Sequence, residues 1–176
     1  MRKIFLTYGL LAGAVMGVSM SVIVGLMHNA VSFEYSMVIG YTTMIIAFSL
    51  IYFGVKNYRE NIGNGAISFG RAIGLGLLIT LVGAVIYSLA WMLLQHFFMP
   101  DFYEKYMAHQ AEVLKASNPS PEELAAGKAQ MESMRVMFQS PVVIFFMTLL
   151  EPLPVGVLIS LITSLILKKK TVETAQ

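Results

Sequence analysis

One acidic residue and two prolines interrupt the last apolar stretch of the chain, in the sequence TLLEPLPVGVLIS at residues 148–160. An ionisable side chain inside a membrane-crossing segment is a functional-site hypothesis by default. Pro152 and Pro154 have no backbone N–H, so the segment should be kinked or broken here. Carbonyl groups freed beside the Glu151 carboxylate are typical of transporter ion sites. The chemistry expected is proton or cation binding, or a hydrogen bond that holds a structural kink.

The position of Glu151 limits which groups can reach it. It lies about 16 residues from the basic end of its segment, a helical rise of roughly 24 Å across a hydrocarbon core of about 30 Å. His96 and His28 are therefore the expected partners, and Tyr87 or Trp91 could donate a hydrogen bond from the same level. The arginines at the basic end should be out of reach.

The elements that carry these residues are membrane helices. Of the 176 residues, 57% are hydrophobic and only 12% are charged, against about 25% charged in soluble domains. Uncharged apolar segments of this length can cross a bilayer as helices. We expect an all-α, polytopic membrane protein forming a single membrane domain over residues 1–176. Its four transmembrane helices are predicted at residues 4–27, 36–55, 72–98 and 142–167.

Basic residues gather on one side of these predicted spans. Lys and Arg in loops are retained in the cytoplasm, so both termini and the loop with Lys56, Arg59 and Arg71 should be cytoplasmic. Contact with anionic lipid is the expected role of this basic edge. The first span should be retained rather than cleaved as a signal peptide, because its apolar run continues unbroken to Met27.

Residues 99–140, between the third and fourth spans, are the only soluble-looking part of the chain. Ser120, Pro121 and Glu123 form an N-cap signature for a second helix within this segment. Leu124, Met131 and Phe138 then recur on one helical face. We expect an extracytoplasmic helical hairpin.

Small residues recur at every fourth position in three of the spans, which lets helix backbones approach closely. Two interpretations are open: the rows pack the four helices of one chain together, or they form a dimer interface or sliding surface. The glycines concerned are Gly9, Gly13, Gly17, Gly25, Gly76 and Gly156.

Several kinds of chemistry lack their residues in this chain. It has no cysteine, and no metalloprotease or serine-hydrolase motif occurs. Methionines at 131–137 could ligate Cu(I), but their spacing is also that of an apolar helix face. The basic residues form no nucleic-acid-binding stripe. We expect no enzyme, no catalytic or metal-binding residues, no cofactor and no nucleic-acid partner.

The chain resembles a family of bacterial membrane proteins labelled domain of unknown function 4199, over about residues 5–170. The resemblance implies a four-span protein of the inner membrane of Gram-negative bacteria and supplies no activity, cofactor or catalytic residue. It rests on Gly40-Tyr41, Tyr58-Arg59, Ser68-Phe69-Gly70 and Glu151-Pro152.

Two functions are compatible with these features. The leading interpretation is a small, non-enzymatic inner-membrane protein that acts as an accessory, assembly or envelope component. Its partners would be the lipid bilayer and copies of itself. The alternative is an ion, proton or small-solute transporter or channel subunit using Glu151 in a proline-broken fourth span. A polar cavity reaching Glu151 would favour the alternative, and a dry, hydrogen-bonded Glu151 the first interpretation.

Overall fold

The structure, a computed structural model, describes residues 1–27 and 33–169, and these residues are almost entirely helical. They form no strand, apart from one isolated antiparallel bridge between Ile67 and Lys169. The predicted all-α class is confirmed. The helices are α1 (Arg2–Met27), α2 (Phe33–Phe48), α3 (Leu50–Asn61), α4 (Phe69–Phe98), α5 (Phe102–Ala116), α6 (Pro121–Met137), α7 (Pro141–Leu150) and α8 (Leu153–Leu167).

Four helical stretches in the described residues are long and apolar enough to cross a membrane: Arg2–Gly25, Met37–Asn61, Phe69–Phe98 and Pro141–Leu167. The predicted multi-pass architecture is therefore confirmed. The second span was predicted to end at residue 55. The helix α3 instead continues through polar residues to Asn61.

The second span also contains an interruption that the sequence did not indicate. α2 and α3 are separated by Ser49, whose hydroxyl donates a hydrogen bond of 2.6 Å to the carbonyl oxygen of Ile46. Serine hydroxyls that bond back to the preceding turn often bend a helix. Ser49 keeps helical backbone angles, φ −57° and ψ −24°, so the two helices form one nearly continuous rod.

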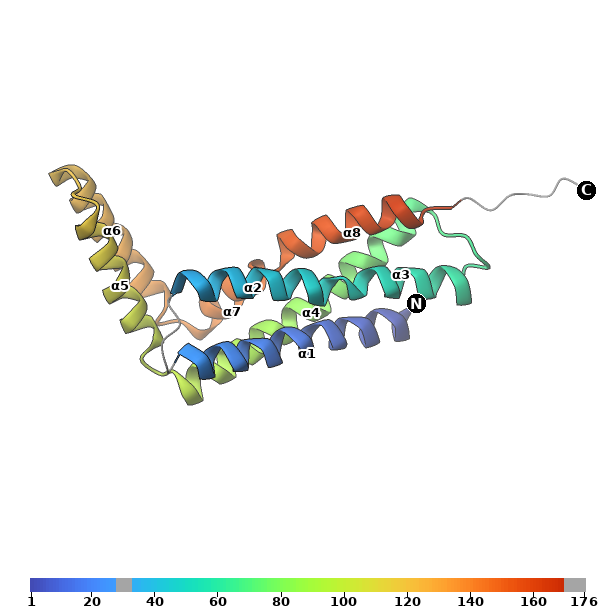
Figure 1. The fold of residues 1–176 in the computed structure, drawn as a ribbon, viewed down its shortest axis with the longest axis horizontal. Coiled ribbons are helices and arrows are strands. Elements are labelled where there is room, and N and C mark those ends of the chain that lie inside the picture. Colours follow the sequence, from blue (N-terminus) through green and yellow to red (C-terminus); the bar gives the residue numbers. More distant parts are fainter. Residues whose placement is uncertain (28–32, 170–176) are drawn as a thin grey trace, which may run out of the picture. The chain divides into compact units, whose positions relative to one another are not determined.

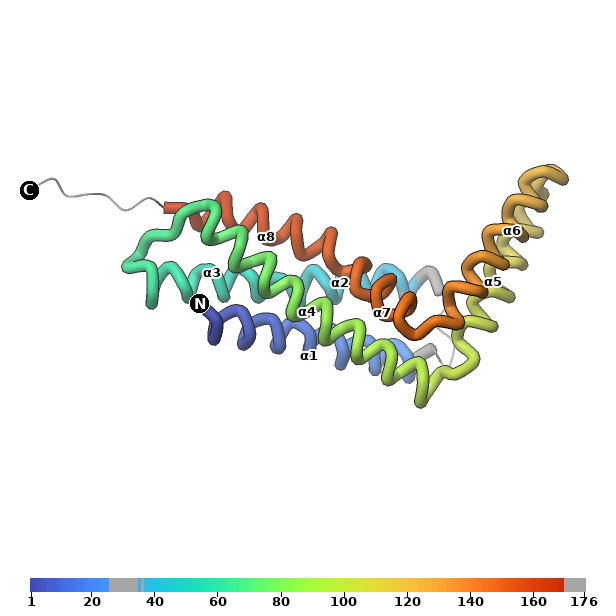
Figure 2. Tube along the Cα trace, turned by 180° about the vertical axis from the view of Figure 1, so that it is seen from behind, coloured from blue at the N-terminus to red at the C-terminus, as the bar shows by residue number. Residues whose placement is uncertain are grey.

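The chain divides into two compact units, Met1–Trp91 with Thr148–Gln176, and Met92–Met147. The helices of the first unit run lengthwise beside one another (Figures 1 and 2). They are α1, α2, α3, α8 and the part of α4 that ends at Trp91. The N-terminus, the α3–α4 loop and the end of α8 lie at the same end of this unit. The expectation of one membrane domain over residues 1–176 stays a prediction.

The interior of the first unit is formed by α1, the α2–α3 segment and α4. Phe48 and Met16 are its largest fully buried side chains. Gly83 of α4 lies beside them, since an added Cβ would fall 3.2 Å from the Phe48 ring and 3.4 Å from Met16 Cε. The outward sides carry large apolar residues such as Val18, which is 65% exposed. An apolar exterior of this kind suits lipid as the surrounding medium.

Glycines bring α1 close to α4. A Cβ added to Gly9 or Gly13 would fall 2.6 or 2.5 Å from a side-chain Cβ of α4. Gly17 is looser, at 3.3 Å, and Gly25 has no such neighbour within 4 Å. Most of the small-residue row on α1 therefore lies at a contact with α4 of the same chain.

A second close contact joins α4 to α8. A Cβ added to Gly76 would fall 2.7 Å from Ser160 Oγ, and one added to Gly156 would overlap the side chain of Thr80. The hydroxyls at this crossing are satisfied locally. Thr80 Oγ1 donates to the carbonyl oxygen of Gly76 at 3.0 Å and lies 3.4 Å from Ser160 Oγ. Small residues thus allow close backbones without leaving a buried hydroxyl unbonded.

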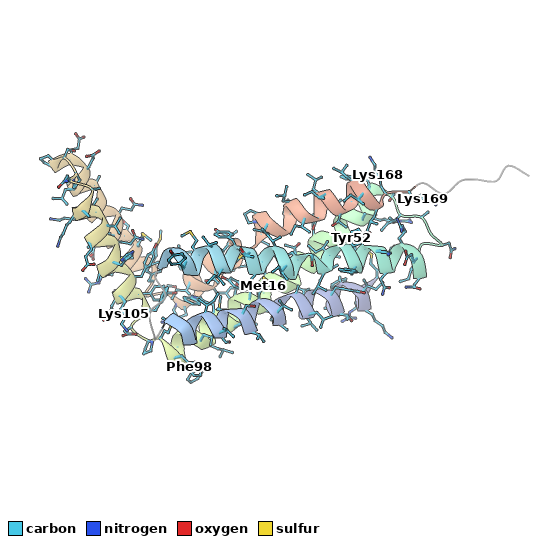
Figure 3. All side chains as sticks on the ribbon, viewed as in Figure 1. Met16, Tyr52, Phe98, Lys105, Lys168 and Lys169 are labelled. Carbon is cyan, nitrogen blue, oxygen red and sulfur yellow. The ribbon has the colours of Figure 1, made fainter. Side chains whose placement is uncertain are left out.

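The loop between α3 and α4 is tied to the chain that follows α8. Ile67 N–H donates to Lys169 O at 3.0 Å, and Lys169 N–H donates back to Ile67 O at 2.9 Å. The loop reverses direction through Asn64 and Gly65, which have φ of 47° and 81°, a region that glycine and asparagine reach most easily. Figure 3 shows Lys168 and Lys169 at this end of α8.

The second unit contains a hairpin of α5 and α6, which contact one another. The Tyr103 and Phe138 rings stack with their centroids 4.3 Å apart. Ser120 N–H donates to Glu123 Oε2 at 2.8 Å, and Glu123 N–H donates to Ser120 Oγ at 3.3 Å, which completes the predicted capping box. The placement of this hairpin outside the cytoplasm stays a prediction.

Candidate functional site

The fourth span is interrupted in the stretch where the sequence predicts a break. α7 ends at Leu150 and α8 begins at Leu153, and the step between them is visible in the orange part of the tube (Figure 2). Pro152 is fully buried and precedes α8 with φ −78° and ψ −13°. Pro152 and Pro154 offer no N–H to the carbonyl groups four residues earlier. Backbone acceptors are therefore released beside Glu151.

Glu151 is held by a hydrogen bond from the fourth helix. Tyr87 Oη of α4 donates to Glu151 Oε2 at 3.0 Å. Tyr87 is only 8% exposed, so the phenol reaches the acid from inside the bundle. Tyr87 was one of the possible donors at this level, and a buried tyrosine hydroxyl usually finds such a partner.

The side chain of Glu151 faces outward. The residue is exposed on the surface of the first unit, although its bond to Tyr87 is partly buried. Within residues 1–27 and 33–169 no ion pair includes Glu151. Exposed residues on the same stretch of chain are apolar, with Leu150 exposed by 62% and Leu158 by 58%. A carboxylate in such surroundings is expensive to leave in contact with lipid.

Tyr41 adds a third polar group to this region. Its helix, α2, contacts α8, and the residue is 44% exposed. Tyr41 belongs to α2, Tyr87 to α4, and Glu151 to the α7–α8 break. Sequence reasoning did not place Tyr41 at this site, because a tyrosine in an apolar span carries no signal for the direction it faces.

The two histidines expected near Glu151 stay predictions. His96 is nine residues beyond Tyr87 on α4, belongs to the other compact unit, and packs edge-on against Phe97 at 4.8 Å. His28 lies outside the described residues. Trp91, one helical turn after Tyr87, is partly buried. The structure therefore brings Glu151 together with Tyr87, and a contact with His96 stays a prediction.

The described part of the chain contains no group of three or more His, Cys, Asp or Glu side chains that could hold a metal ion. The chemistry that the site offers consists of one carboxylate, two phenols and two released carbonyl groups. These groups can accept and donate hydrogen bonds or balance a single positive charge.

Comparison with known proteins places the chain in a family. Residues 7–169 match the family described as Protein of unknown function (DUF4199). The chain belongs to this family. No curated protein and no solved structure matches it.

The motif residues of this DUF4199 protein lie in three places. Gly40 and Tyr41 lie on α2, and Glu151 and Pro152 at the broken span. The other motif residues lie on α3, in the α3–α4 loop and at the start of α4, at the basic end. There, Asn57 Nδ2 donates to Tyr8 Oη at 3.2 Å, which joins α3 to α1.

The predicted basic edge of the DUF4199 chain is found at this same end. Lys56 and Arg59 are carried by α3, and Arg71 by the first turn of α4. Arg59 NH2 lies 3.4 Å from Glu60 Oε1 and is partly buried, while Arg71 is exposed. This arrangement suits a role at a charged membrane surface.

Proposed function

We propose that this chain is a non-enzymatic membrane protein that acts as an accessory or assembly component, joining another membrane-embedded protein through the face around Glu151. The observation that carries the proposal is the outward-facing acid held by a buried tyrosine. An exposed carboxylate in an apolar span is costly in lipid, and its cost is removed when another protein covers it.

The packed interior of the first unit supports this proposal. Glycines and hydroxyl residues close the contacts of α4 with α1 and α8. In the described residues, no buried side-chain nitrogen or oxygen lacks a hydrogen-bond partner. The polar group with an unbonded acceptor that matters most here is Glu151, and it faces outward rather than into a space between the spans. A solute path through a single chain finds no support in this arrangement.

A second candidate is a transporter or channel subunit for ions, protons or small solutes. The proline break favours it, because released carbonyl groups beside a carboxylate recur in the ion sites of discontinuous helices. With four spans, such a path would run between copies of the chain. Proteoliposome flux of protons and Na⁺, compared between the native protein and Glu151→Gln, tests this candidate. Equal background flux in both removes it for those ions.

The size of the complex in native membranes tests the assembly function. The native chain, extracted in mild detergent, should migrate in a complex larger than the 19.4 kDa chain. Glu151→Leu should shift it toward the single chain. Thr7→Leu, which removes an exposed polar group on α1, should leave the complex intact. Migration of the native chain as a monomer would overturn the proposal.

We also propose a location in the inner membrane with both termini in the cytoplasm. Support comes from the basic residues at one end of the first unit, where Figure 3 shows Lys168 and Lys169. Basic residues next to membrane spans are retained on the cytoplasmic side.

A further inference from the structure

We infer that the partner at the Glu151 face is a membrane-spanning helix of a different protein, which places a Lys or Arg side chain at the level of Glu151. This inference rests on the assembly function proposed above and adds the chemistry of the partner. The proposed interface consists of the Glu151 carboxylate, the Tyr87 phenol behind it and the apolar surface around them.

The carboxylate of Glu151 has a second oxygen that no group of the described chain bonds. An ionised carboxylate offers two oxygens and several lone pairs. Oε2 accepts from Tyr87 at 3.0 Å, and no hydrogen bond or ion pair within the described chain involves Oε1. The second oxygen is therefore available to a donor that arrives from outside the chain.

The acid is held in place rather than free to withdraw. Tyr87 is buried and fixes one oxygen from the inside. Pro152, also buried, restricts the backbone directly after Glu151, because its ring locks φ near −65°. A polar group that is fixed before binding loses less entropy when its partner docks.

The surface around the acid suits a helix in lipid rather than a soluble segment. Leu150 and Leu158 are exposed by 62% and 58%, and Tyr41 by 44%. Helices in a bilayer associate through close packing with a few polar contacts. A single carboxylate centred on an apolar face is complementary to a helix that is apolar except for one cation.

Within the described first unit, no Lys or Arg lies at the level of Glu151. In the described first unit, Lys and Arg lie near the helix ends, as with Lys56, Arg71 and Lys168. Lys168 is separated from Glu151 by a helical rise of about 25 Å. A parallel copy would bring a second Glu151 to the same level and repel the first. We therefore assign the cation to a partner of different sequence.

The experiment uses a synthetic probe helix in place of the native partner. The full-length protein, which has no cysteine of its own, receives a donor dye at Ile62→Cys in the exposed α3–α4 loop. It is reconstituted in phosphatidylcholine vesicles with an acceptor-labelled leucine–alanine helix that carries one Lys at the level of Glu151. The matched probes carry Leu or Glu at that position. Energy transfer reports association.

The Lys helix should associate about tenfold more strongly than the Leu helix, at the upper end of the range for polar contacts in membranes. The Glu helix should associate least. Glu151→Gln, which keeps the shape of the side chain, should lose most of the preference, and Glu151→Leu should abolish it. Equal association of the Lys and Leu helices, or a preference that survives in both variants, would overturn the inference.

The two proposals fail in different ways. If the native-membrane complex depends on Glu151 but the Lys helix shows no preference, the assembly function stands and the cationic partner is wrong. If the native chain is monomeric, the assembly function itself is wrong, whatever the probe helix does.

Discussion

At the scale of single residues, the Tyr87–Glu151 pair combines a buried donor with an exposed acceptor. A tyrosine buried without a partner for its hydroxyl would leave an unsatisfied donor, which costs about 1–3 kcal/mol. Glu151 removes that cost on α4, and Tyr87 in turn fixes one carboxylate oxygen. Removing either partner therefore affects both the stability of the bundle and the direction of the acid.

Replacing Tyr87 by phenylalanine should lower stability by about 1 kcal/mol, because hydrogen bonds between membrane helices contribute about 0.6 to 2 kcal/mol. Thermal unfolding in detergent measures the change. Tyr35→Phe, at a tyrosine of α2 that is 70% exposed, is the matched control and should have no effect. In a double-mutant cycle with Glu151→Leu, which removes the acceptor, the two losses should not add. Additive losses would show that the bond contributes nothing.

At the scale of helices, α6 depends on the charge of one exposed acid. The hydrogen bond from the backbone N–H of Ser120, and then the contact with its side chain, holds the pKa of Glu123 below its usual value. A carboxyl group with a lowered folded-state pKa stabilises above its unfolded pKa. That contribution is lost as pH falls through the folded-state pKa. The start of α6 should therefore loosen in acid.

An NMR titration of the Glu123 carboxyl carbon in the full-length protein tests this pH dependence. In Ser120→Ala the pKa of Glu123 should rise only part of the way toward its ordinary value, because the side-chain contact is lost while the backbone N–H of residue 120 still donates. Ser133→Ala is the control, because the Ser133 hydroxyl bonds only to its own helix, at Ala129 O. An unchanged Glu123 pKa in Ser120→Ala would contradict a contribution from the Ser120 side chain, and an ordinary Glu123 pKa in the native protein would contradict the capping account.

The glycine contacts give a matched pair of helix-scale variants. Gly156→Ala should destabilise the protein by about 1–3 kcal/mol, because the added methyl overlaps Thr80 in a contact that cannot expand freely. Gly25→Ala meets no atom within 4 Å and should be neutral or stabilising by up to about 1 kcal/mol, from better helix propensity. Shifts in Tm in detergent measure both. Equal shifts would mean that α4 and α8 are not in close contact.

Some of these elements follow from sequence and some do not. The spans follow from uncharged apolar length, and the break at Glu151 and Pro152 follows from the missing proline N–H. The interruption at Ser49 could not be predicted, because the sequence does not show whether a serine hydroxyl in a helix bonds back to the preceding turn. The outward direction of Glu151 depends on how α8 rotates against α4, and the bridge at Ile67 depends on which loops meet. Both are set by tertiary packing rather than by local pattern.

At the scale of the whole molecule, charge is segregated between regions of the chain. The first unit has an apolar exterior and gathers its basic residues at one end, where the α3–α4 loop pairs with Lys169. The second unit contains α5 and α6, which carry both acids and bases. Because basic residues next to membrane spans are retained in the cytoplasm, this segregation of charge predicts the orientation of the protein in the membrane.

Labelling of single cysteines tests that orientation, and the absence of native cysteine makes each label unambiguous. Ile62→Cys reports the α3–α4 loop, where the residue is 50% exposed. Ser133→Cys reports the exposed side of α6, and neither change alters net charge. A membrane-impermeant maleimide should label Ser133→Cys in spheroplasts, and Ile62→Cys only after permeabilisation. The reverse pattern would place the basic end outside the cytoplasm and contradict the proposed orientation.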